Sequence, residues 1–266
     1  MISTRVLPCL LLKGQGLVKT VRFRDPVYVG DPRNAVRIFN EREVDELLIL
    51  DITATSENRP PKFELIREIV SEAFMPVAYG GGIRNVEDAQ RILALGVEKI
   101  VVNTYGIEDP SFVGKAAQLF GSQSVVVCMD VKHDWRGKQA VYSNGGRKRS
   151  RFAPVAFAQE MEANGAGELI VNSIDRDGTM QGYDIDLIKS VTDKVNVPVI
   201  ACGGAGNLDD CVRAIRDGGA SAVAAGSMFV FYGEHRAVLI SYPTQDTLRR
   251  LFAEEERQGE TAKAQP

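Results

Sequence analysis

The stretch "PVAYGGGIRNVEDAQRILALG" (76–96) returns later in the chain as "PVIACGGAGNLDDCVRAIRDG" (198–218). Both stretches read as a short apolar strand, a glycine-rich turn and a helix that opens on asparagine. The stretch "LDITATSE" (50–57) precedes the first copy, and "SIDRDGTM" (173–180) holds the same place before the second. This self-similarity indicates that the chain is built from two copies of one supersecondary arrangement.

Short apolar, β-branched runs recur along the whole chain and are separated by helical patterns. Strands are predicted near residues 6–12, 46–52, 77–79, 99–103, 124–131, 168–173, 198–201 and 221–225. Strands that alternate with helices form parallel βαβ units. Two copies of four such units predict an α/β fold, a (β/α)8 TIM barrel built from two homologous half-barrels. A doubly wound open sheet is the alternative, but it does not require a symmetric second half.

The length of 266 residues suits one barrel of this kind. We expect a single (β/α)8 domain over 1–254 and a disordered tail over 255–266, where the sequence is polar. Two strand-to-helix intervals, 14–33 and 132–153, exceed the usual length of about 2–6 residues and occupy the same position in each half. They are predicted to be long loops that serve a site at the carboxyl ends of the strands.

Composition narrows the class of protein. The chain is 44% hydrophobic and 25% charged with a net charge of −3, which gives no sign of a nucleic-acid or membrane partner. No apolar run approaches the roughly 20 residues of a membrane span. Four cysteines and two histidines, without a pair at ligand spacing, predict neither a disulfide framework nor a metal or cofactor site. A reduced, cytoplasmic enzyme or enzyme subunit is the expectation.

Each half carries a glycine-rich turn between a strand and a helix, "YGGGIRN" (79–85) and "CGGAGN" (202–207). Backbone N–H groups in such turns can approach an anion closely. The next strands end in "VNT" (102–104) and "AGS" (225–227), which add a hydroxyl and free amides. One such turn is explained as well by tight packing, but two equivalent turns around a barrel mouth predict a ligand with two phosphates.

Charged residues are predicted to meet at the amino ends of the strands. Side chains alternate along a strand, so Arg5 shares an inward face with the apolar residues that follow it. By the same parity Glu46, Lys99 and Glu168 point inward, and buried charges of this kind need partners. A structural salt-bridge plug explains the pattern equally well. Above these charges the inward positions are apolar, as in any barrel core: Leu7, Cys9, Leu48, Leu50, Val101, Val126, Cys128 and Ile170.

Over residues 1–232 the motifs "RVLPCL", "LDITATSE", "GGGIR", "NGGRK", "NSIDRDGTMQGYD", "VPVIACGGAG" and "GSMF" resemble, in order, the cyclase subunit of imidazole glycerol phosphate synthase. The "DRDGTMQGYD" and "GGRK" motifs are the most specific of these. The phosphoribosyl isomerase of the same pathway shares the half-barrel repeat but lacks the "NGGRK" stretch. The resemblance implies a lyase-family synthase subunit that receives ammonia from a glutaminase subunit and uses it to close an imidazole ring.

The resemblance also implies roles for individual residues. Phosphate contacts fall on Gly82, Asn103 and Thr104 in the first half and on Asp177, Gly178, Gly204, Gly226 and Ser227 in the second. The inward charges Arg5, Glu46, Lys99 and Glu168 become a gate for ammonia. The apolar bore would carry neutral ammonia, whereas the ammonium ion would lose its hydration there. Glu98, with Arg5 and Lys99, becomes a candidate contact of the glutaminase.

One expected carboxylate is missing. The stretches "VLPCLLLKGQG" (6–16) and "VVVCMDVKHDW" (125–135) correspond, but Leu11 stands where the second copy has Asp130. The resemblance implies that a cyclase uses one carboxylate from each of these strands as an acid–base pair. Asp130 is then the retained catalytic residue, and Leu11 cannot transfer a proton. Two further acids at strand ends, Asp51 and Asp175, lie on other strands and are not expected to replace it.

The last part of the chain points to a paralogous group. The stretch "FYGEHRAVLISYP" (231–243) stands where the cyclase has its final helix. Together with "CLLLK" (9–13) it resembles a group associated with lipopolysaccharide O-antigen sugar genes. That resemblance implies a barrel that supplies ammonia to a separate sugar amidotransferase, which makes acetamidino sugars. The alternatives are a working cyclase that makes imidazole glycerol phosphate and AICAR in histidine biosynthesis, and a scaffold that only activates its glutaminase.

Two smaller predictions concern loops and thiols. His133, Trp135 and "GGRKRSR" (145–151) are predicted to close over a ligand, and a solvated loop is the alternative. Cys202 and Cys211 are predicted to be core or near-surface thiols without a role.

Overall fold

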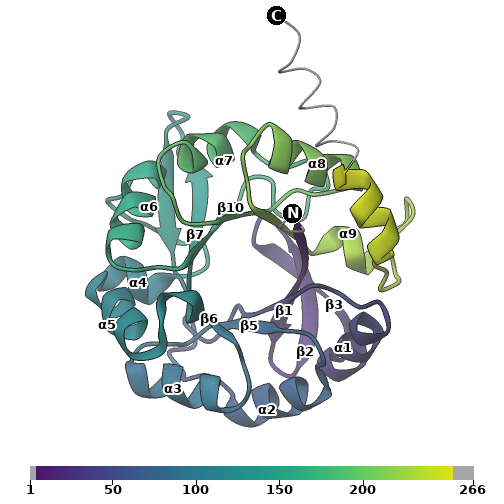
Figure 1. Ribbon diagram of the computed structural model, residues 1–266, viewed down its shortest axis with the longest axis horizontal. Coiled ribbons are helices and arrows are strands. Elements are labelled where there is room, and N and C mark those ends of the chain that lie inside the picture. The colour runs from purple at the N-terminus through teal and green to yellow at the C-terminus, as the bar shows by residue number, and fades with distance from the viewer. Residues whose placement is uncertain (1–3, 254–266) are drawn as a thin grey trace, which may run out of the picture.

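Eight parallel strands close into a barrel in the computed structural model, which describes residues 4–253 (Figure 1). The strands are β1 (Arg5–Lys13), β4 (Leu47–Asp51), β5 (Val77–Gly80), β6 (Lys99–Val102), β7 (Val125–His133), β10 (Glu168–Ser173), β11 (Val199–Cys202) and β12 (Ala222–Ala225). Each strand pairs in parallel with the next, and β12 pairs with β1. The predicted (β/α)8 barrel is confirmed, because this closure leaves no open sheet edge.

Helices cover the outside of the barrel (Figure 1). They are α1 (Pro32–Glu41), α2 (Phe63–Glu72), α3 (Val86–Ala94), α4 (Thr104–Glu108), α5 (Ser111–Phe120), α6 (Pro154–Ala163), α7 (Ile185–Thr192), α8 (Leu208–Arg216) and α9 (Ser227–Val230), with a short 3-10 helix at Ser122–Ser124. The two repeated stretches form β5–α3 and β11–α8. Both helices begin as predicted: the Asn85 side chain accepts from Asp88 N at 2.7 Å, and that of Asn207 from Asp210 N at 3.0 Å.

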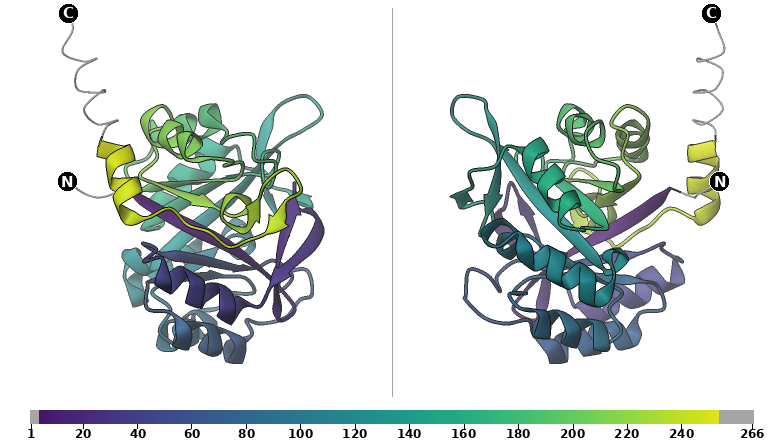
Figure 2. Two further views of the ribbon diagram at one scale, coloured as in Figure 1. Left: turned by 90° about the vertical axis from the view of Figure 1, so that its right-hand side faces the viewer. Right: turned by 60° about the vertical axis from the view of Figure 1, so that its left-hand side comes forward.

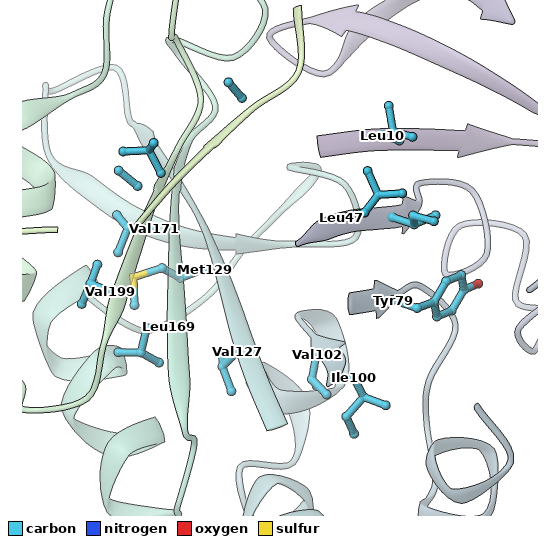
Figure 3. Packing of buried hydrophobic residues seen from close by; sticks show 14 of the residues in the cluster. Leu10, Leu47, Tyr79, Ile100, Val102, Val127, Met129, Leu169, Val171 and Val199 are labelled. Carbon is cyan, nitrogen blue, oxygen red and sulfur yellow. The ribbon is translucent and has the colours of Figure 1, made fainter. Parts of the chain in front are cut away.

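The strand residues divide between two separate apolar clusters. Outward side chains pack against the helices, and Figure 3 shows Leu10, Tyr79 and Met129 among them. Inward side chains fill the axis of the barrel instead, and this second cluster includes Leu7 and Ile170. Because each strand is buried on both faces, the strands read as continuous apolar runs in the sequence.

The two predicted long loops are β-hairpins, and this corrects the sequence analysis. The first contains β2 (Gly16–Val21) and β3 (Arg24–Gly30), and the second contains β8 (Gln139–Ser143) and β9 (Lys148–Arg149). Both arise because β1 and β7 run past the rim of the barrel and the chain then reverses to pair antiparallel with them. The reversal after β1 uses Gly14, whose φ of 66° is open to glycine. The second hairpin stands well clear of the barrel in both views of Figure 2.

The end of the described chain also differs from expectation. The stretch 231–243 forms a small hairpin of β13 (Phe231–Tyr232) and β14 (Ala237–Val238), and a helix follows over 245–253. A helix therefore does follow the hairpin. Its approach is fixed by Tyr242, whose hydroxyl donates to Val6 O at 2.8 Å, and Leu248 packs into the core. Residues 255–266, predicted as a tail, lie outside the described residues. Within 4–253, no helix has the length and apolarity that a membrane crossing requires.

Candidate functional site

A cavity of about 900 Å³ opens at the carboxyl ends of the strands. Its wall is formed by the ends of the barrel strands and by both hairpins. Of the residues predicted for the site, it includes Leu11, Gly82, Asn103, Thr104, Asp130 and Asp177. The predicted side chains from the two half-barrels therefore face one shared space. Within residues 4–253, no group of three or more His, Cys, Asp or Glu side chains is placed to hold a metal ion.

Asp130 is buried in this cavity wall and is held by amides. Its carboxylate accepts from Asn172 Nδ2 at 2.8 Å and from Asn103 Nδ2 at 3.2 Å. Burial raises the pKa of Asp130 to about 7, the Asn172 hydrogen bond acts in the opposite direction, and the nearby Asp177 adds to the increase. A carboxyl group with this pKa can both accept and donate a proton near neutral pH.

Leu11 faces the same cavity from the opposite half-barrel, and its strand neighbour is also apolar. In the β1–β4 pair, Leu11 lies in register with Leu50. In the equivalent β7–β10 pair, Asp130 lies in register with Asn172. The cavity therefore has a hydrocarbon pair on one side and a hydrogen-bonded acid–amide pair on the other, so proton-transferring groups stand on one side only at this level.

Two other acids near the mouth are occupied by structural hydrogen bonds. The carboxylate of Asp51 accepts from Arg59 at 2.8 Å and from the backbone N–H of Thr53 at 3.1 Å. Asp175 accepts from the backbone N–H and the ring Nδ1 of His133, both at 2.9 Å, and is not part of the cavity wall. Neither carboxylate occupies the position that Leu11 leaves without one.

The first-half residues predicted to hold phosphate surround an open part of the cavity. Gly82 has a φ of 75°, and a Cβ there would lie 2.9 Å from Arg59 O, so glycine is required. The Thr104 hydroxyl accepts from Asn144 N at 2.9 Å, which ties the second hairpin to this side of the mouth. The Asn103 side chain turns toward Asp130 and donates to Cys128 O at 2.9 Å.

Cations also line the cavity. Lys13, Arg24 and Arg147 belong to the cavity wall, and within the described residues no acidic side chain forms an ion pair with any of them. Lys148, a fourth, lies 3.9 Å from Glu108. Uncompensated positive charge beside open space is favourable for an anionic ligand.

The second-half residues are covered. Gly178, Gly204, Gly226 and Ser227 do not belong to the cavity wall. The β2–β3 hairpin covers two of them: a Cβ on Gly178 would be 2.0 Å from Thr20 O, and one on Gly226 would be 2.1 Å from Lys19 Nζ, while Gly204 lies against Gly182 and Arg176. The structure thus brings the first-half phosphate residues to the cavity and leaves most of the second-half ones outside it.

Lys19 on this hairpin is a residue that the sequence analysis missed. Its side chain is buried, its ammonium group donates to Cys9 O, and a Cβ on Gly226 would lie 2.1 Å from Lys19 Nζ. Burial lowers the pKa of Lys19, while the neighbouring Cys9 and Asp177 act to raise it. The sequence signal was the single lysine within the otherwise uncharged strand "GLVKTV" (16–21), which was read as part of a loop.

At the amino ends of the strands the four predicted charges meet in a closed ring, here called the charged ring (Arg5, Glu46, Lys99 and Glu168). Arg5 bonds to both glutamates, and Lys99 lies 3.0 Å from Glu46 and 2.9 Å from Glu168. Although burial opposes it, the two glutamates raise the pKa of Arg5. Between the ring and the cavity the axis is filled by buried apolar side chains, among them Leu7, Leu48 and Val126.

Other predicted residues have separate positions. Glu98 is exposed directly before β6, beside the charged ring. Trp135 is 85% exposed and neither it nor His133 lines the cavity, so in this structure both have the positions of a solvated loop. Cys202, predicted to have no role, does line the cavity, and its hydrogen bond with Cys9 lowers the pKa of Cys9. Cys211 is buried on α8, as a core thiol.

The closed barrel, its half-barrel repeat and the acid at the end of β7 define a recognised class of protein. Residues 5–236 match the family of histidine biosynthesis proteins, and the chain therefore belongs to that family.

Within the family, the chain is a HisF-like subunit of the imidazole glycerol phosphate synthase type. It is 52% identical to a Pseudomonas aeruginosa protein provisionally named imidazole glycerol phosphate synthase subunit hisF2, over 93% of this chain and 99% of the relative. A Leptospira interrogans protein with the provisional name HisF is 45% identical over 95% of this chain and 100% of its own length. A Vibrio vulnificus protein provisionally named hisF3 is 45% identical over 95% and 97%. The family resemblance is confirmed, and the link to sugar genes stays a prediction.

Proposed function

We propose that the chain receives ammonia from a glutaminase subunit and conducts it along the barrel axis, without closing an imidazole ring itself. The observation that carries this proposal is the Leu11–Leu50 pair, which stands at the register of Asp130–Asn172. Ring closure needs proton transfer on two faces of a substrate, and general acid–base catalysis contributes about 10²–10⁴-fold per group. With hydrocarbon on one face, the cyclase reaction loses that contribution.

The amino end of the barrel supports the first part of the proposal, which is the receipt of ammonia from a glutaminase. The charged ring lies at the end of the axis opposite the cavity, and its four ion pairs form a closed circuit. An ammonia molecule that enters there requires at least one of these pairs to open. A glutaminase docked beside Glu98 and Lys99 is positioned both to supply the ammonia and to open an ion pair of the charged ring. The relatives' provisional names describe subunits, which accords with a partner of this kind.

The apolar axis of the barrel supports the second part of the proposal, which is the conduction of ammonia. Its lining is apolar and includes three alanines, Ala78, Ala222 and Ala224, whose side chains leave the most room. A neutral ammonia molecule gives up little on entering such a path, whereas an ion would lose its hydration without replacement. The thiols of Cys9 and Cys128 lie at the upper end, where the path meets the cavity.

The acceptor of the ammonia is proposed to be a sugar. The hairpin over 231–243 and the "CLLLK" stretch of β1 resemble the group associated with O-antigen sugar genes. In that setting a separate sugar amidotransferase consumes the ammonia to make an acetamidino sugar of lipopolysaccharide. Location of the gene beside sugar-modification genes, and not beside histidine genes, is the expected observation.

The proposal is tested by supplying the purified chain with the cyclase's bisphosphate substrate and excess ammonium salt. Wild-type protein is expected to form imidazole product at a rate near background, and Leu11→Asp to form it about 100-fold faster or more. The double variant Leu11→Asp with Asp130→Asn should return to background. Rapid turnover by the wild-type chain would overturn the proposal.

A working cyclase is the second candidate, and the state of Asp130 favours it. A pKa of about 7 suits a group that acts alternately as acid and base, and the cavity of about 900 Å³ has room for a small phosphorylated substrate. The same assay distinguishes this candidate, because a cyclase turns over without the Leu11→Asp change.

A scaffold that only activates its glutaminase is distinguished by blocking the axis. Cys9→Trp places an indole where the axis meets the cavity, and Cys9→Ala serves as the matched control. For a conduit, Cys9→Trp should abolish glutamine-dependent product formation by the downstream enzyme while glutamine hydrolysis persists. For a scaffold, both activities should persist. Thermal unfolding of the two variants establishes that each is folded.

A further inference from the structure

We infer that the cavity accepts a small molecule with one phosphoryl group, and that this group binds on the first-half side of the mouth. The inference is separate from the proposed conduction of ammonia and concerns the ligand of the cavity. It differs from the two-phosphate ligand that the paired glycine turns predict.

The two glycine turns are equivalent in sequence but differ in what covers them. On the first-half side, Gly82 and Thr104 belong to the cavity wall. Their counterparts in the second half, Gly204 and Ser227, do not. A ligand that enters the cavity therefore reaches the first-half turn directly and does not reach the second-half turn.

The hairpin is fixed on the second-half side by several contacts. Thr20 Oγ1 donates to Asp177 at 3.2 Å, and Arg22 Nε donates to Asp175 O at 3.1 Å. Beneath it the Lys19 ammonium is bonded to Cys9 O and lies against Gly226. The Lys19 side chain thus fills the space beside Gly226, and its ammonium group donates a hydrogen bond to the protein itself.

Cations at the mouth divide in the same way. Arg147 lines the cavity on the hairpin that Asn144 ties to Thr104 of the first half, and within residues 4–253 it forms no ion pair with an acidic side chain. On the second-half side Arg236 donates to Gly178 O at 3.2 Å and Arg176 donates to Gln181 O at 3.3 Å. Arg176 and Arg236 keep their charge but do not belong to the cavity wall, so a phosphoryl group inside the cavity meets Arg147 and not these two arginines.

The end of the ligand away from the phosphoryl group faces hydrogen-bond acceptors. Opposite the first-half turn, the cavity wall offers the Asp130 carboxyl and the side-chain oxygen of Asn172, which has no hydrogen-bond partner within the described residues. These are acceptors, which repel a second phosphate and attract hydroxyl or N–H donors. A polyol or amine end matches them, so a sugar monophosphate is the class of ligand that the cavity fits.

The test compares two ligands of equal carbon number, ribulose 5-phosphate and ribulose 1,5-bisphosphate, by isothermal titration calorimetry on the chain alone at low salt. The monophosphate is expected to bind as tightly as the bisphosphate, within about threefold, or more tightly, because the acceptors of the far wall repel the second phosphate. Arg147→Ala should weaken both at least tenfold, because a charge-assisted hydrogen bond contributes about 1.5–3 kcal/mol. Ser227→Ala, on the covered side, should change neither by more than about twofold.

Three results would overturn the inference: no binding of the monophosphate at millimolar concentration, no loss on Arg147→Ala, or a bisphosphate that binds more than threefold tighter. If the bisphosphate bound more tightly and Ser227→Ala removed this difference, the second-half turn would be shown to hold the extra phosphate. Ammonia delivery is measured separately, with the glutaminase present. Failure here with intact delivery removes this inference alone, and failure of delivery with intact binding removes the conduit alone.

Discussion

Buried charged groups in this barrel have two different kinds of partner. Each member of the charged ring has two partners of opposite sign, so the cost of burying it is offset within the ring. Asp130 instead has amide donors and a thiol neighbour but no ion pair among residues 4–253. A buried carboxylate without a cation holds its proton to higher pH, and this has consequences for stability.

Asp130 is predicted to make the protein less stable as pH rises. Below pH 3.8 the carboxyl is protonated in both the folded and unfolded states, and it adds no penalty. Between 3.8 and about 7 the unfolded chain loses the proton while the folded protein keeps it, so the free energy of unfolding decreases. Asp130→Asn should therefore stabilise the protein by about 1–3 kcal/mol at pH 8 and by much less at pH 4. Urea denaturation at the two pH values measures this, and an equal effect at both would contradict a pKa of about 7 for Asp130.

Removal of one cation from the charged ring should be costly. Lys99→Met leaves Glu46 and Glu168 to share Arg5 alone, and we expect a loss of about 2–4 kcal/mol in the free energy of unfolding. Lys115→Met is the matched control, because Lys115 lies 4.0 Å from Asp109 in an exposed pair worth about 0–1 kcal/mol. Thermal or urea unfolding compares them. Equal losses in the two variants would show that the ring contributes no more than a surface pair.

At the scale of elements, the β2–β3 hairpin decides how much of the mouth is open. Its docking depends on Gly178, where a Cβ would lie 2.0 Å from Thr20 O. Gly178→Ala should displace the hairpin and increase the rate of proteolytic cleavage at Arg22 or Arg24 about tenfold. Gly145→Ala is the matched control: its φ of 63° is similar, but a Cβ there meets nothing within 4 Å. Limited trypsin digestion with time resolves the two, and equal cleavage rates would exclude a role for this contact.

Sequence reasoning predicted the barrel strands and missed the strands of the hairpins. The eight strands could be predicted because each is buried on both faces and therefore reads as an unbroken apolar run. The hairpin strands could not, because β3 is exposed over most of its length and its sequence, "RDPVYVG" (24–30), shows no clean alternation. The site was affected in turn. The correspondence of the two half-barrels, with the family resemblance, placed Leu11 and Asp130 correctly in the cavity, but the missed hairpin hid Lys19.

The whole molecule has two unlike ends, and they define opposite surfaces. The carboxyl end carries both hairpins and the cavity, whereas the amino end carries the charged ring. Around the ring, residues that precede three adjacent strands are exposed: Phe74 before β5, Glu98 before β6 and Leu119 before β7. Two large apolar side chains beside an acid and a ring of charges form a surface suited to a protein partner.

Phe74 is the member of this surface best placed to anchor the proposed glutaminase. Its ring is 90% exposed, yet its backbone is fixed, because Phe74 N donates to Asn40 Oδ1 at 3.0 Å and Asn40 Nδ2 donates to Glu72 O at 2.5 Å. An aromatic side chain presented rigidly binds with little loss of conformational freedom. Phe74→Ala should therefore weaken glutaminase binding about 30-fold or more, as measured by calorimetry, with no loss of thermal stability. Trp135→Ala, which removes an equally exposed aromatic ring from the opposite end, should leave that affinity unchanged. If Trp135→Ala weakened binding and Phe74→Ala did not, the partner would dock at the cavity, and the proposed direction of ammonia transfer would be reversed.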